Sequence, residues 1–153
     1  MSSSTMMVYG FGFECDTEDS ILIQFIKKHK EAFCRTERER DVYKEILTYS
    51  PENQFNLDDI FCDYDCDSSG CQGLGAVIAN IMSRETGVRF DYCPPDGDCN
   101  TSAAVLYSES YPWQMNEVER DLTAEKLTEI CKTYMNELGI DGEPDFLAQE
   151  YYG

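Results

Sequence analysis

The N-terminal part of the chain alternates between large and small side chains, which is the pattern of a strand. From residue 7 to residue 15, every second residue is a large apolar residue or a cysteine. On the other side of this segment, Gly10 and Gly12 would let another backbone or a helix approach closely. The pattern therefore predicts a strand over residues 7–15.

Four later stretches place apolar residues at the spacing of three and four that a helix requires. They cover about residues 17–33, 36–49, 76–86 and 123–138. Thr36 and Glu39 have the spacing of a capping box, and Asn116 and Glu119 resemble a second, shorter one. Gly87 suits a left-handed C-cap. The sequence thus predicts about four helices with defined ends.

Residues 88–92 alternate as a half-buried strand should, and residues 103–107 are apolar enough to return beside them after the turn at 93–98. Separate strands and helices in this order favour an α+β fold. We expect a single compact domain over residues 1–153, with a small antiparallel or mixed sheet of about three strands covered by the helices. Residues 1–6 and about 141–153 are candidate flexible ends, although the aromatic residues of the tail could also pack.

The chain is strongly acidic. Its 30 acidic and 12 basic residues give a formal charge of −18. Residues 1–50 carry nine acidic and seven basic side chains, whereas residues 51–153 carry 21 and five. This charge works against direct binding to nucleic acid or to an anionic membrane, and a cationic partner complements it. An acidic surface that only favours solubility is the alternative.

The sequence also indicates where the protein acts. The N-terminus has no signal-peptide pattern, and no stretch approaches the roughly 20 apolar residues that span a bilayer. We therefore expect a cytoplasmic protein. Its eight cysteines would then be reduced thiols, of which Cys34 and Cys131 lie on predicted helices and are expected to be buried or half-buried.

A loop rich in carboxylates and thiols precedes the third helix and could hold a metal ion. Asp63, Asp65 and Asp67 match the first positions of a calcium loop, but Ser68 and Leu74 stand where that loop needs a glycine and a bidentate carboxylate. Zinc could instead bind thiolates, although their spacing is looser than that of paired knuckles. The candidate ligands are Cys62, Cys66, Cys71, Cys93 and Cys99. A metal-stabilised binding or regulatory domain is therefore the alternative hypothesis.

No catalytic signature accompanies this loop. The only histidine, His29, lies between Lys28 and Lys30 and is expected to be a solvated helix residue. The mixed-charge run at residues 35–41 is expected to be a solvated helix face. Nothing separates a general acid from a general base among so many carboxylates. We expect no enzyme and no cofactor.

The acidic residues themselves have the spacing that a binding surface would need. Alternate strand residues lie about 6.6 Å apart, and helix residues four apart lie about 5–6 Å apart, which is of the order of the phosphate spacing along a nucleic acid. The candidate carboxylates are Asp58, Asp59, Asp63, Asp65 and Asp67 in the loop, and the helical series Glu117, Asp121, Glu125 and Glu129. Aromatic residues often carry interface energy. The candidate aromatics are Tyr64, Tyr111, Trp113, Tyr151 and Tyr152, although Trp113 is expected to be buried in the core.

In size, charge and lack of catalytic motifs, the chain resembles the small acidic proteins with which phages and mobile elements inhibit host defence, such as anti-CRISPR and anti-restriction proteins. The resemblance is compositional and transfers no individual residue. It implies a non-enzymatic inhibitor or decoy whose carboxylates stand where phosphates would bind. The expected partner is a basic nucleic-acid-binding protein such as a defence nuclease, with residues 58–67 as the first candidate contact.

Overall fold

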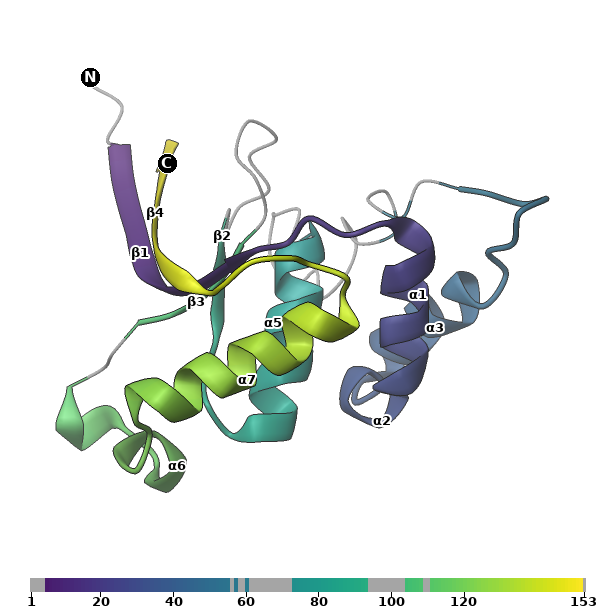
Figure 1. The fold of residues 1–153 in the computed structure, drawn as a ribbon. Coiled ribbons are helices and arrows are strands. Elements are labelled where there is room, and N and C mark those ends of the chain that lie inside the picture. The colour runs from purple at the N-terminus through teal and green to yellow at the C-terminus, as the bar shows by residue number, and fades with distance from the viewer. Residues whose placement is uncertain are drawn as a thin grey trace, which may run out of the picture.

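The computed structural model describes residues 5–55, 57, 60, 73–93, 104–108 and 111–152. They form an α+β fold in which helices pack on an open, antiparallel, four-stranded sheet (Figure 1). The strands are β1 (Thr5–Glu14), β2 (Asp91–Cys93), β3 (Ala104–Tyr107) and β4 (Asp145–Tyr152), in the sheet order β2-β3-β1-β4. The α-helices of the described residues are α1 (Asp19–Lys28), α2 (Lys30–Phe33), α3 (Glu37–Ile46), α5 (Gly73–Thr86), α6 (Glu117–Arg120) and α7 (Ala124–Glu137). A 3-10 turn, η1 (Pro112–Gln114), precedes α6.

The α+β class predicted from the sequence is confirmed, but the number of strands is not. The sheet has four strands instead of about three, because residues 145–152 of the acidic tail form β4. The described helices are also more numerous than the four expected. The stretch predicted as one helix over 17–33 is divided at His29 into α1 and α2, and the capped turn at 116–120 forms the separate helix α6.

The main core lies between the helices and one face of the sheet. Val77, Ile78, Ile81 and Met82 of α5 are fully buried, as their helical spacing predicts. Apolar residues of α1, α2, α3 and α7 pack in the same cluster as Phe13 on β1. A smaller cluster on the sheet contains Ala104 and Leu106 with Leu147 of β4 packed against them.

The glycines of β1 allow β3 to approach closely. A Cβ atom added at Gly12 would lie 1.8 Å from the carbonyl oxygen of Val105, and one added at Gly10 would lie 2.6 Å from that of Tyr107. The approach of another backbone, predicted from these two small residues, is confirmed. Since Phe11 pairs with Tyr107 and Gly12 with Leu106, this approach fixes the register of the sheet centre.

The elements divide the molecule into two ends. Figure 1 shows α1, α2 and α3 together at one end, and α6 with the start of α7 at the other, on the far side of α5. Among the described residues, no helix combines the length and apolarity needed to cross a membrane.

Candidate interaction surface

The sequence-predicted site residues fall into two groups. The loop candidates lie outside the described residues, and they are Asp58, Asp59, Asp63, Tyr64, Asp65 and Asp67. The thiols Cys62, Cys66, Cys71 and Cys99 of the zinc hypothesis also lie outside them, while Cys93 contributes its backbone to β2. The structure describes the second group of candidates, which extends from Tyr111 to Glu125, and places Tyr151 and Tyr152 at the end of β4.

Two aromatic rings form an exposed stack in front of α6. The rings of Tyr111 and Trp113 lie 4.8 Å apart with an interplanar angle of 4°. Tyr111 is 63% exposed and Trp113 is 74% exposed. The expected burial of Trp113 is therefore wrong, because Pro112 begins η1 and that turn carries the indole outward onto the Tyr111 ring. Stacked, exposed aromatic faces are suited to the contact of cationic side chains.

A set of hydrogen bonds, which we call the clamp, holds the segment from Gln114 to Glu119 against residues 87–89, which follow α5. The Arg89 guanidinium donates to the Gln114 carbonyl oxygen at 2.5 Å and to Glu119 Oε1 at 2.7 Å. The Asn116 amide donates to the Gly87 carbonyl oxygen at 2.7 Å. Asn116 and Glu119 also form the capping box of α6 that the sequence predicts. Both ends of the segment from Gln114 to Glu119 are thus tied to residues 87–89.

The central carboxylate of the clamp is buried, and its ionisation depends on its partners. Burial alone raises the pKa of the Glu119 carboxyl, but hydrogen bonds from the Arg89 side chain and from backbone N–H groups, that of Asn116 first, leave the net pKa below its ordinary value. The hydrogen bond and charge of Glu119 in turn raise the pKa of Arg89. A charged, fully paired Glu119 therefore supports the segment that presents the aromatic stack.

The carboxylates beside the stack do not form the single helical row that their spacing suggested. Glu117 lies on α6, Asp121 is its C-cap, and Glu125 and Glu129 lie on α7 after the break at Thr123. All four carboxylates are exposed. Among the described residues none of the four forms an ion pair. We call Tyr111, Trp113, Glu117, Asp121 and Glu125 the 111–125 surface.

The charge asymmetry of the sequence becomes an asymmetry in space. Residues 16–52, which contain α1 to α3, carry nine acidic and seven basic side chains, a net charge of −2. Residues 111–130, which contain α6 and the start of α7, carry five acidic and two basic side chains, a net charge of −3 in a much shorter segment. Because α6 and the start of α7 lie at the opposite end from α1 to α3 (Figure 1), the α6 end has the higher density of negative charge.

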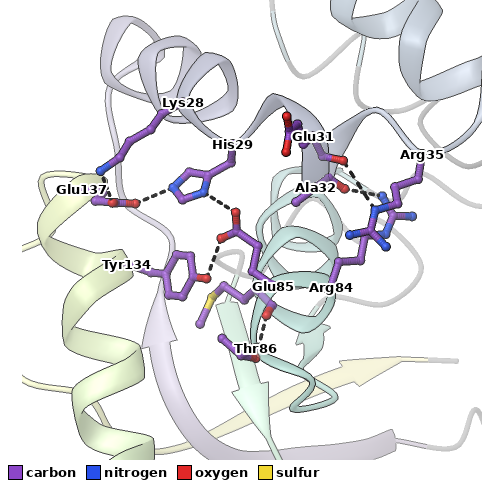
Figure 2. Close-up of polar contacts among 11 residues, drawn as sticks. Lys28, His29, Glu31, Ala32, Arg35, Arg84, Glu85, Thr86, Tyr134 and Glu137 are labelled. Atoms are coloured by element: carbon purple, nitrogen blue, oxygen red, sulfur yellow. Dashed lines mark hydrogen bonds and ion pairs between the residues drawn. The ribbon is translucent and has the colours of Figure 1, made fainter.

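A second polar cluster, which the sequence did not predict, joins α1, α5 and α7. Figure 2 shows His29 between two carboxylates, with Nδ1 2.7 Å from Glu85 Oε2 and Nε2 2.6 Å from Glu137 Oε2. Tyr134 donates its hydroxyl to Glu85 Oε1 at 2.7 Å, and Lys28 pairs with Glu137. The His29 side chain is only 11% exposed, so the expectation of a solvated histidine is wrong.

The His29 cluster (Lys28, His29, Glu85, Tyr134 and Glu137) satisfies its own polar groups. Burial alone raises the pKa of Glu137, but hydrogen bonds from Lys28 and His29 leave the net pKa below its ordinary value. Burial and the hydrogen bond to Glu85 raise the pKa of Tyr134. The members come from segments about 50 to 110 residues apart, so no local sequence signal brings them together. The arrangement ties three helices to one another.

Another buried carboxylate lies within the run expected to be solvated. Glu39 is only 2% exposed, so the prediction for residues 35–41 is wrong at this position. Its Oε2 accepts a 2.7 Å hydrogen bond from Arg84, which also donates to the carbonyl oxygens of Ala32 and Phe33. Glu39 also completes the capping box with Thr36 that the sequence predicts.

The described thiols are poor nucleophiles and poor metal ligands. Cys15 and Cys131 are buried, and burial raises the pKa of Cys15 strongly and that of Cys131 to about 12. Burial also raises the pKa of the half-buried Cys34. Within the described part of the chain, no three acidic, histidine or cysteine side chains gather as a metal site would require. The expectation that Cys34 and Cys131 are half-buried or buried is confirmed.

Comparisons with known proteins add no family or relative to these observations. Neither a scan against protein-family models nor searches of curated proteins and solved structures found a match to this chain.

Proposed function

We propose that this chain is a non-enzymatic acidic inhibitor or decoy that binds a basic nucleic-acid-processing protein, in the manner of anti-CRISPR and anti-restriction proteins. The observation that carries the proposal is a group of exposed carboxylates beside an exposed aromatic stack at the α6 end. Glu117, Asp121, Glu125 and Glu129 are exposed, and none of them forms an ion pair in the described part of the chain. A surface of this kind complements a cationic groove built for phosphates.

The aromatic stack adds what charge alone does not supply. Long-range charge raises the association rate, but specificity and slow dissociation depend on well-packed contacts. Tyr111 and Trp113 offer a flat face directly before α6, which carries Glu117. A guanidinium can stack on such rings while its N–H groups meet a carboxylate, so arginine is the cation that this surface suits best. We therefore take the 111–125 surface as the described part of the binding site.

The first experiment compares two charge-neutralised variants that differ only in place. In the test variant, Glu117→Gln, Asp121→Asn and Glu125→Gln remove three carboxylates of the 111–125 surface. In the control variant, Glu31→Gln, Glu37→Gln and Glu45→Gln remove three exposed carboxylates at the α1–α3 end. Both have a net charge of −15 instead of −18. Tagged wild-type chain and both variants are used as bait in lysate of the organism that encodes the chain.

The proposal expects a basic nucleic-acid-binding protein to be captured by the wild type and by the control variant, and at least about tenfold less of it by the test variant. Short duplex DNA should compete for the captured protein, and salt should weaken the capture because the contacts are ionic. Capture of only neutral or acidic proteins, or equal loss with both variants, would contradict the proposal.

A further inference from the structure

Among the described residues, the edge of the sheet formed by β4 is long and unpaired. β4 is the last strand in the sheet order, and it pairs with β1 through eight consecutive residue pairs, from Thr5 with Tyr152 to Gly12 with Asp145. No other strand in the described part of the chain lies along its outer side. In an antiparallel strand, about every second residue directs its N–H and C=O groups to that outer side. The outer edge of β4 is therefore a template on which another strand can form hydrogen bonds.

This edge lacks most of the features that usually protect sheet edges. β4 contains no lysine and no proline, and its pairing with β1 shows no bulge. Its charged residues, Asp145 and Glu150, are both acidic. Negative charge protects the edge against a second copy of this chain, which carries −18 itself. The same charge attracts an extended segment that contains lysine or arginine.

The C-terminal half of β4 lies in a part of the sheet that has only two strands among the described residues. β3 pairs with β1 only from Phe11 to Glu14, so the part of β1 before Phe11 is paired on one side alone among the described residues. Figure 1 shows β1 and β4 continuing together as a two-stranded ribbon beyond β3. A two-stranded ribbon is only marginally stable by itself, and a third strand would stabilise it.

At the start of β4, one face of the edge is apolar. Phe146 lies opposite Phe11, which lies opposite Tyr107, so these three rings share one face of the sheet. Together with Ala124 and Leu127 of α7 they line a hollow of about 180 Å³. Phe146 is 78% exposed although its ring touches that of Phe11. An apolar side chain of an added strand would cover this ring.

The residues on either side of Phe146 point to the other face, where Leu147 packs against Ala104 and Leu106 and Asp145 lies at the start of the strand. Asp145 and Leu147 line a hollow of about 570 Å³. The further carboxylates that line it are those of Glu14, Asp16, Asp141 and Glu143. A cationic side chain of an added strand would meet these carboxylates.

From the open edge and the carboxylates gathered at its start, we infer that β4 binds an extended segment of the partner as a fifth strand, and that this segment carries cationic side chains. The inference rests on the proposed function in one respect, that the partner is cationic. Backbone hydrogen bonds to β4 supply affinity, and the carboxylates at the start of β4 with the exposed Phe146 ring supply specificity, as side-chain contacts do in other strand-addition complexes.

A synthetic peptide tests this binding mode directly. The probe is an octapeptide of alternating lysine and valine with blocked ends, used at a concentration at which it is monomeric by itself. The control is its diastereomer with D-valine, which has the same charge and composition but does not form a regular strand. The inference expects the full-length chain to bind the probe at least about tenfold more tightly than the diastereomer at low salt. It also expects slower amide hydrogen exchange in β4 when the probe is bound.

Variants of the chain separate the edge from charge in general. Asp141→Asn with Asp145→Asn should weaken binding of the probe by several-fold, whereas Glu31→Gln with Glu37→Gln, which removes the same charge elsewhere, should not. Equal binding of the two peptides, no binding of either, or unchanged exchange in β4 would overturn the inference. A dimer of the free chain with protected β4 amides would overturn it in favour of a second copy. In each case the capture test of the 111–125 surface still decides the proposed function by itself.

Discussion

At the scale of single residues, the two buried glutamates that the structure describes each cap a helix and also bind an arginine. Glu39 and Glu119 each complete a capping box, and each also pairs with an arginine from a distant segment, Arg84 and Arg89. A buried charge is costly unless it is paired and hydrogen-bonded, so these glutamates are fixed by both contacts together. The spacing of Thr36 and Glu39 predicts the cap, but it contains nothing about Arg84.

Removal of Arg84 should therefore destabilise the fold much more than removal of a surface arginine. In Arg84→Met, Glu39 stays buried without its cation, and the carbonyl oxygens of Ala32 and Phe33 lose a donor. We expect the free energy of unfolding to fall by about 3 kcal/mol. Arg40→Met, at an exposed position on the same helix as Glu39, is the control and should change it by less than about 0.5 kcal/mol. Urea unfolding measures both values, and equal effects would show that the ion pair contributes nothing.

The clamp carboxylate and the His29 cluster predict sensitivity to acid. The pKa values of Glu119 and Glu137 are both lower in the folded chain than the ordinary value of 4.5. Folding therefore gains stability from both groups above that ordinary value, and loses it as the pH falls through their lower folded-state pKa values. In urea unfolding, the contribution of these two groups to the free energy of unfolding should be constant above about pH 5 and should decrease below about pH 4.5. Glu119→Gln should reduce this slope, whereas the exposed neighbour Glu117→Gln should leave it unchanged.

At the scale of elements, the sequence predicts whatever is encoded by local periodicity and misses whatever depends on distant partners. The apolar spacing of α5, the capping boxes of α3 and α6 and the antiparallel pairing of β2 with β3 are confirmed, although β2 begins at Asp91 and not at residue 88 as predicted, and the turn predicted at 93–98 lies mostly outside the described residues. The strand β4 was missed because its residues alternate weakly, and its pairing with β1 lies more than 130 residues away along the chain. The break between α1 and α2 was missed because His29 ends α1 at contacts to Glu85 and Glu137 that only the tertiary fold supplies.

At the candidate site, too, the sequence predicts local features and misses contacts between distant segments. Spacing correctly marked Glu117, Asp121, Glu125 and Glu129 as exposed, because acidic side chains usually are, but it gave no sign that Glu119 in the same capped segment is buried against Arg89. It failed for Trp113, since a large aromatic residue is buried more often than not, and only the backbone of η1 turns this one outward onto Tyr111. Nothing in the sequence before residue 145 indicates that an edge strand lies beside β1.

The close approach of β1 and β3 predicts that a side chain at Gly12 strongly destabilises the fold. A Cβ atom there would lie 1.8 Å from the Val105 carbonyl oxygen, which is backbone and cannot rotate away. Gly12→Ala should lower the free energy of unfolding by about 3 kcal/mol or more, because the two strands must separate. Gln24→Ala, at an exposed position on α1, is the control and should change it little. Thermal and urea unfolding test this, and a well-folded Gly12→Ala protein would mean that the strands pair in another register.

At the scale of the whole molecule, charge is concentrated where binding is proposed, and this has a cost. Residues 111–130 combine a net charge of −3 with exposed aromatic rings, whereas the longer segment 16–52, with α1 to α3, has a net charge of only −2. Self-repulsion of a strongly charged chain destabilises its compact state. Neutral side chains at these positions would make the fold more stable. The cost in stability is consistent with the proposal that the acidic surface binds a cationic partner.

Self-repulsion among the carboxylates predicts that salt stabilises the free chain while it weakens partner binding. The Debye length falls from about 10 Å at 0.1 M salt to about 3 Å at 1 M, so repulsion among exposed carboxylates is screened. We expect the melting temperature to rise by a few degrees over this range, since about 1 kcal/mol corresponds to about 2–4 °C in a chain of this length. Combining the two triple variants gives a net charge of −12, and this protein should show a clearly smaller rise. If its rise equals that of the wild type, salt acts through general effects on apolar burial, and the repulsion proposed for the acidic end is negligible.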